Sequence, residues 1–147
     1  MKITRLFLGL LLLSAAPAWA QEEESPKVKK ARSENELEKE GESTDQACGT
    51  KLKVSIDWAS FEANPAGWSD KSVSGYCESG LGALRSLCEG QKAKAYVAKT
   101  VKEYVCRAVK TKEEWKAVRK AGTLEWLIPP DAVNADSYAK AELLKNL

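Results

Sequence analysis

The stretch SDKSVSGYCESGLGALRSLCEG, residues Ser69–Gly90, decides the fold that the sequence predicts. Its apolar residues recur at steps of four, four, three and four: Val73, Cys77, Leu81, Leu84 and Cys88. This spacing places them on one face of a helix. Ser69 or Asp70 can cap the start, and Gly90 can end the helix in the left-handed conformation. We therefore expect a central helix near residues 70–89.

This helix restricts how the four cysteines of the chain can pair. Cys77 and Cys88 lie about 16 Å apart along a helix that rises about 1.5 Å per residue. A disulfide needs Cα atoms within about 7 Å of each other, so these two cannot bond to one another. Each must reach another element, and the remaining cysteines are Cys48 and Cys106.

Chain direction chooses between the two pairings that remain. Cys48 precedes a strand near residues 51–58, and a short loop then places the start of the helix near the far end of that strand. The helix runs back, which predicts the disulfides Cys48–Cys88 and Cys77–Cys106. If the loop instead carries the chain back before the helix starts, the pairing becomes Cys48–Cys77 with Cys88–Cys106.

Residues 1–20 have the pattern of a secretory signal peptide. Lys2 and Arg5 precede the apolar run Leu6–Leu13, and Ala18–Ala20 supplies the small residues of a cleavage site. The run is too short to cross a bilayer, which takes about 20 residues. We expect an exported protein, periplasmic or secreted, with no transmembrane segment after cleavage. Export into an oxidising compartment favours two disulfides over free thiols.

Residues 21–46 contain nine acidic and five basic residues and hardly any apolar ones. Such a composition cannot bury enough surface to offset the entropy lost on ordering. The sequence predicts a disordered charged linker here, whose removal leaves the stability of the domain unchanged.

Residues 47–147 are enough for one domain with a single small core. Alternating or apolar runs predict strands near 51–58, 101–109, 114–119 and 123–128. A last helix is expected near 135–146, with the stripe Tyr138, Ala141, Leu144 and Leu147. The sum is an α+β domain: a small antiparallel sheet with two helices packed on one face, held by two disulfides.

Residues 111–122 admit two interpretations. Thr111 and Glu114 form a capping-box pattern, which is typical of a helix start. A β-meander with a turn at residues 120–122 fits the short connection to the following strand better. We favour the meander.

The chain contains no histidine. This excludes Ser-His-Asp and Cys-His catalysis and every zinc site that needs histidine. The sequence has no glycine-rich phosphate loop and no dinucleotide-binding fingerprint. We expect no metal, no cofactor and no nucleic-acid partner.

A basic surface is the main candidate for binding. Residues 92–120 contain ten basic and three acidic residues. Part of this charge gathers around one tryptophan, a combination suited to anions. The candidate binding residues are Lys110, Lys112, Trp115, Lys116, Arg119 and Lys120. Their partner would be an anionic envelope polymer or a protein.

A carboxylate pair offers a second interpretation. Glycosidases need only two acids, so a chain without histidine can perform that chemistry. Asp57 and Glu125 each stand next to a tryptophan that could stack on a sugar. We expect an exported binding, accessory or inhibitor-like module. The alternatives are a carboxylate-only hydrolase of envelope or environmental polysaccharide and a purely structural envelope protein. The sequence does not indicate an oligomeric state.

Overall fold

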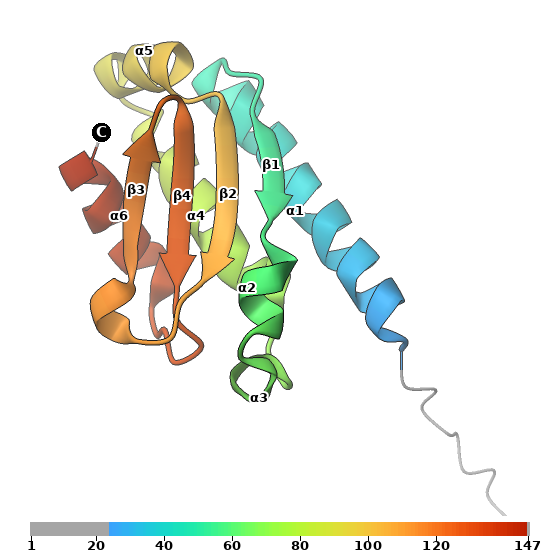
Figure 1. The fold of residues 1–147 in the computed structure, drawn as a ribbon. Helices are drawn as coiled ribbons and strands as arrows, with labels where there is room; N and C mark the ends of the chain where they lie inside the picture. Colours follow the sequence, from blue (N-terminus) through green and yellow to red (C-terminus); the bar gives the residue numbers. More distant parts are fainter. Residues whose placement is uncertain (1–23, 147) are drawn as a thin grey trace, which may run out of the picture.

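The computed structural model describes residues 24–146 (Figure 1). The elements follow in the order α1 (Pro26–Cys48), β1 (Lys53–Ile56), α2 (Trp58–Glu62), α3 (Pro65–Trp68), α4 (Val73–Leu87), α5 (Gln91–Thr100), β2 (Glu103–Ala108), a 3₁₀ turn η1 (Lys112–Glu114), β3 (Lys116–Lys120), β4 (Thr123–Ile128) and α6 (Ala135–Asn146). The predicted signal peptide lies outside the described residues. Among residues 24–146, no helix combines the length and apolar character that crossing a bilayer takes.

The four strands form one sheet in the order β1-β2-β4-β3. The predicted mixture of a four-stranded sheet with helices is confirmed. The described residues form six α-helices rather than the expected two, and the expected antiparallel direction is wrong for two of the three pairings. β1 and β2 are parallel, β2 and β4 are parallel, and only β3 and β4 are antiparallel. The reason is the long connection through α2–α5, which carries the chain back to the end of the sheet where β1 began.

The β3–β4 hairpin confirms the predicted meander. Its two-residue turn, Ala121–Gly122, has φ values of 46° and 93°. Positive φ at both positions is what a type I′ turn requires. The capping box of Thr111 and Glu114 also forms, but it starts only the 3₁₀ turn η1.

Helices cover one face of the sheet. Figure 1 shows α4 and α6 behind the strands and α1 running along the β1 side. α4 packs against both α1 and α6. The core is formed by alternate strand residues, among them Tyr104, Leu124 and Trp126, which are at most 1% exposed. Residues of the opposite face, such as Val105 and Glu125, remain half-exposed.

The central helix is the predicted one, with different ends. α4 begins after Ser72, whose hydroxyl accepts from the Gly75 N–H at 3.3 Å, rather than after Ser69 or Asp70. Gly90 has a φ of −85°, so it is not left-handed as expected. The helix approaches the sheet closely at Gly80, where a Cβ would overlap Tyr104 and Trp126.

Both predicted disulfides are confirmed. Cys48–Cys88 joins Cα atoms 5.0 Å apart, and Cys77–Cys106 joins Cα atoms 5.5 Å apart. α4 runs opposite to β1, as the argument from chain direction requires (Figure 1). One disulfide therefore links α1 to the end of α4, and the other links the middle of α4 to the sheet.

The linker is the main correction. Residues 26–46, expected to be disordered, belong to the 23-residue helix α1. Its buried residues are Leu37, Gly41, Thr44 and Cys48. They recur at steps of four, three and four and form a narrow helical stripe of mostly small residues. This stripe packs against α4 and β1, although the low hydropathy of the segment indicates no core residues. Ser25 caps the helix, and Pro26 occupies its first position.

The last helix is also confirmed, but its buried face differs from the predicted stripe. Ala139, Glu142 and Leu143 are buried. Leu144 is 65% exposed, and Ala141 is also exposed. Tyr138 is half-buried, and Leu147 lies outside the described residues.

Candidate functional site

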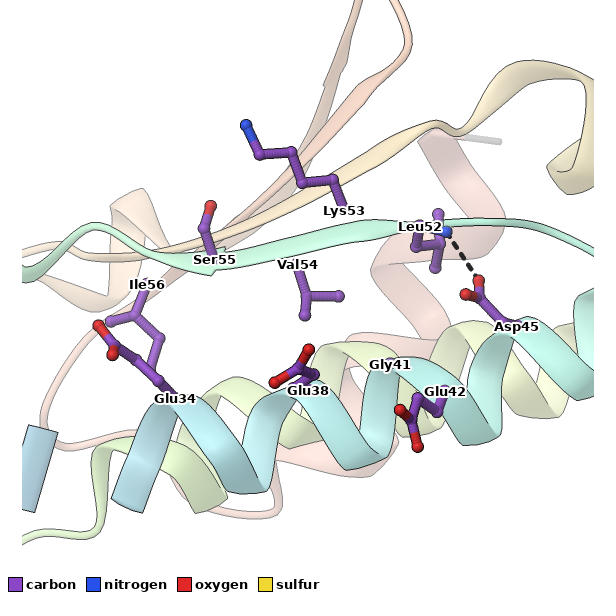
Figure 2. A pocket seen from close by; sticks show the side chains of 10 residues that line it. All are labelled: Glu34, Glu38, Gly41, Glu42, Asp45, Leu52, Lys53, Val54, Ser55 and Ile56. Carbon is purple, nitrogen blue, oxygen red and sulfur yellow. Dashed lines mark hydrogen bonds between the residues drawn. The ribbon is translucent and has the colours of Figure 1, made fainter. Parts of the chain in front are cut away.

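A groove of about 420 Å³ lies between α1 and the free edge of β1 (Figure 2). Its lining residues are Glu34, Glu38, Gly41, Glu42, Asp45, Leu52, Lys53, Val54, Ser55 and Ile56. Val54 and Ile56 point toward α1, whereas Lys53 and Ser55 point away from it. The helix can lie this close because Gly41 has no side chain: a Cβ there would sit 2.8 Å from Cγ1 of Val54.

One wall of the groove is a row of four acids on α1: Glu34, Glu38, Glu42 and Asp45. The acids at the ends of the row are held by neighbouring residues. The Leu52 N–H donates to Asp45 at 2.8 Å, and Nε1 of Trp58 donates to Glu34 at 2.7 Å. Within residues 24–146, the two central carboxylates, Glu38 and Glu42, make no hydrogen bond and no ion pair. They are exposed.

The other wall is the unpaired backbone of β1, an edge strand bonded only to β2. The Lys53 N–H donates to Lys102 O at 3.0 Å, and the Asp57 N–H donates to Cys106 O at 2.9 Å. Because backbone groups of a strand alternate in direction, the N–H and C=O of Val54 and Ile56 face the groove. In the described part of the chain, no other residue bonds to them.

The six residues of the predicted basic cluster have different surroundings. Trp115 is 6% exposed and stacks on Tyr138 at 4.0 Å, so it belongs to the core. Lys112 pairs with Asp131 at 3.4 Å. Arg119 lies over the ring of Tyr96 at 5.7 Å.

The remaining members of that cluster are exposed lysines in different positions. Lys110 lies in the loop after β2. Lys116 and Lys120 lie on β3, each two residues from Val118, so they share one face of the sheet, and Arg119 lies on the other. Lys116 and Lys120 therefore share one face of β3, whereas Arg119 lies on the other face and Trp115 is buried.

The two acids of the hydrolase interpretation lie near the uncovered face of the sheet. Asp57 forms an ion pair with Arg107 at 3.0 Å. Glu125 lies on β4 opposite Val105 of β2 and Val118 of β3. Its neighbour Trp126 is 1% exposed and cannot stack on a sugar. No set of three or more potential metal ligands comes together within residues 24–146.

The groove escaped sequence reasoning because its acidic wall lies in the segment interpreted as a linker. A usable signal was present. Residues 37, 41, 44 and 48 have helical spacing and end in a cysteine. Four acids follow the neighbouring face at steps of four, four and three, which also fit a helix.

No protein-family model matches the chain. No curated protein and no solved structure is significantly similar to it. The geometry of the groove therefore carries the functional argument by itself.

Proposed function

We propose that this protein is an exported, non-enzymatic binding module that takes an extended segment of a partner protein as an additional strand beside β1. The observation that supports this most directly is the unpaired edge of β1 along a groove open to an extended chain. In strand addition, backbone hydrogen bonds supply affinity and flanking pockets supply specificity. The Val54 and Ile56 backbones offer the bonds, and α1 offers the flanking surface.

The groove is formed before any partner arrives. The Cys48–Cys88 disulfide fixes the end of α1, and the Asp45–Leu52 hydrogen bond closes the connection to β1. A preformed site loses less conformational entropy on binding than a mobile one. These two links hold α1 and β1 at a fixed distance from each other, as a site for a single inserted strand requires.

The other edge of the sheet provides a contrast. β3 carries Lys116, Arg119 and Lys120, and lysine-rich edges are a common defence against unwanted strand pairing. β1 has a single charged residue, Lys53. Of the two edges, β1 is the one suited to a partner strand. Binding of an anionic polymer has less support, because Trp115 of the basic cluster is buried and Lys112 is paired with Asp131.

Export is the coarser part of the proposal. Two disulfides are compatible with the periplasm or the cell exterior. The sequence also predicts a signal peptide that would be cleaved after Ala20. This supports a secreted or periplasmic location for the proposed module.

The test uses an immobilised library of random peptides of about ten residues, the upper end of common strand lengths. Val54→Pro removes a backbone N–H on the groove side and none of the bonds to β2, since edge strands tolerate proline at such positions. We expect this variant to lose peptide binding. The control Val54→Thr keeps the N–H and should retain it.

NMR supplies a readout that does not depend on a variant. When a selected peptide is added to the wild-type protein, the Val54 and Ile56 amides should become protected from hydrogen exchange. Peptide binding that leaves both amides unprotected, or that survives Val54→Pro, would show that strand addition is wrong.

A further inference from the structure

Two acids in the middle of the groove are unpaired within residues 24–146. Glu38 and Glu42 both line the groove from α1, and the Glu38 carboxylate points toward β1 (Figure 2). Both are exposed, and neither has a hydrogen-bond or ion-pair partner among the described residues. The acids on either side of them, Glu34 and Asp45, are already occupied by Trp58 and Leu52. The groove thus offers two free negative charges at its centre, next to unpaired strand backbone.

The spacing of these acids matches an extended chain. Residues four apart on a helix are separated by about 6 Å along its axis. Alternate residues of a strand are separated by about 6.6 Å and point to the same side. Two side chains at positions i and i+2 of an added strand can therefore meet Glu38 and Glu42 together.

The two sides of an added strand would meet different surroundings. Its side chains follow those of the neighbouring strand, so one set points toward α1 with Val54, and the other points away with Lys53 and Ser55. A cation on the first side meets free carboxylates. On the second side it meets Lys53, which offers a cation no attraction and is already paired with Glu103 at 3.9 Å.

From this we infer that the partner segment carries lysine or arginine at alternate positions, with the two basic side chains paired to Glu38 and Glu42. The inference rests on the proposed function, because it specifies which strand the β1 edge accepts. A second copy of this chain fits poorly, since pairing two β1 edges about a twofold axis would bring two acidic rows together.

The experiment measures binding of synthetic peptides to the whole protein by fluorescence anisotropy. Two peptides have the same composition, two lysines among threonine and valine residues. One has the lysines at i and i+2, and the other has them at i and i+3. A third, neutral peptide has serine in place of both lysines. Net charge is therefore constant between the first two, and only the side on which the lysines point differs.

We expect the i, i+2 peptide to bind about two- to fivefold tighter than its isomer, the gain typical of one further exposed ion pair. The preference should shrink as salt rises, because exposed charges are screened. The double variant Glu38→Gln, Glu42→Gln should lose the preference. Asp70→Asn with Glu89→Gln changes the net charge equally at exposed sites outside the groove and should keep it.

The other outcomes are distinct. Equal binding of the two isomers, with protection of the Val54 and Ile56 amides, would overturn the alternating pattern and leave strand addition intact. Tighter binding of the neutral peptide would also overturn the pattern alone. If none of the three peptides binds or protects these amides, strand addition fails and the inference fails with it.

Discussion

The helices α1 and α4 lie side by side and share a disulfide, yet they are built on opposite principles. α4 buries eight of its 15 residues, and α1 buries four of its 23. The stripe of α4 contains leucines, whereas that of α1 is one leucine, one glycine, one threonine and one cysteine. The difference shows that a helix can belong to a core through a few well-placed residues while its composition resembles a disordered segment.

Polar contacts orient α1 on its neighbours. The Ser74 hydroxyl donates to Glu36 at 2.5 Å, and Arg85 pairs with Glu40 at 2.5 Å. The Thr44 hydroxyl donates to Leu81 O of α4 at 3.4 Å. Exposed ion pairs contribute only about 0–1 kcal/mol each. We therefore expect most of the stability that α1 provides to come from Leu37 and the Cys48–Cys88 disulfide.

Deleting α1 should lower the stability of the protein more than any other change considered. A chain that starts at Ala47 uncovers the face of α4 on which α1 packs and removes one wall of the groove. Loss of one buried leucine alone costs about 2–5 kcal/mol, and 1 kcal/mol corresponds to roughly 2–8 °C. We expect the melting temperature to fall by more than about 10 °C, measured by circular dichroism. A chain that starts at Glu24 is the control, and equal melting of the two would restore the linker interpretation.

A single substitution tests whether the one leucine of the α1 stripe counts as much as a leucine of α4. Leu37 is 1% exposed and Leu81 is 0% exposed. Replacing either by alanine should lower the free energy of unfolding by about 2–5 kcal/mol in urea titrations. Val28→Ala, at a residue that is 50% exposed on α1, should change it by less than about 0.5 kcal/mol. A Leu37→Ala effect as small as that of Val28→Ala would mean that α1 is only loosely attached.

The smallest effect concerns repulsion between the two helices. Burial raises the pKa of Glu78 on α4, and Glu36 and Glu40 on α1 raise it further. The folded state therefore binds this proton more readily than the unfolded state, so the contribution of Glu78 to stability falls as pH rises from about 4.5 through the raised pKa. Glu78→Gln should slightly raise the melting temperature at neutral pH and have no such effect at pH below about 4. A lower melting temperature at neutral pH would show that this carboxylate is stabilising.

The sequence predicts α4 and the strands well because their patterns are local. Leu81 and Leu84 repeat with the helical period, and Leu124, Trp126 and Ile128 alternate. The disulfides follow from the geometry of that helix. Strand direction was missed because the antiparallel prediction did not include α5 as part of a long crossover between β1 and β2.

The groove was missed for a different reason. Its candidate binding residues are the acids without a partner. Contacts between residues far apart in sequence, such as Trp58 with Glu34, determine which acids these are. Composition cannot distinguish Glu38, which has no hydrogen-bond or ion-pair partner in the described part of the chain, from Glu36, which accepts from Ser74. In the same way, Trp115 in a basic segment suggests a binding surface, and only packing on Tyr138 shows that it is core.

The strand order has a kinetic consequence. β3 and β4 are joined by a two-residue turn and can pair as soon as they are made, whereas β1 pairs with β2 across about 50 residues, from Lys53 to Glu103. Closing a loop of that length lowers the conformational entropy of the chain before any stabilising strand contact has formed. Such pairings therefore form late and slowly. The β1 edge, which we propose as the binding site, is therefore among the last parts of the molecule to assemble. Under the proposed strand addition, a half-folded chain lacks the groove, so peptide capture would report completed folding as well as recognition.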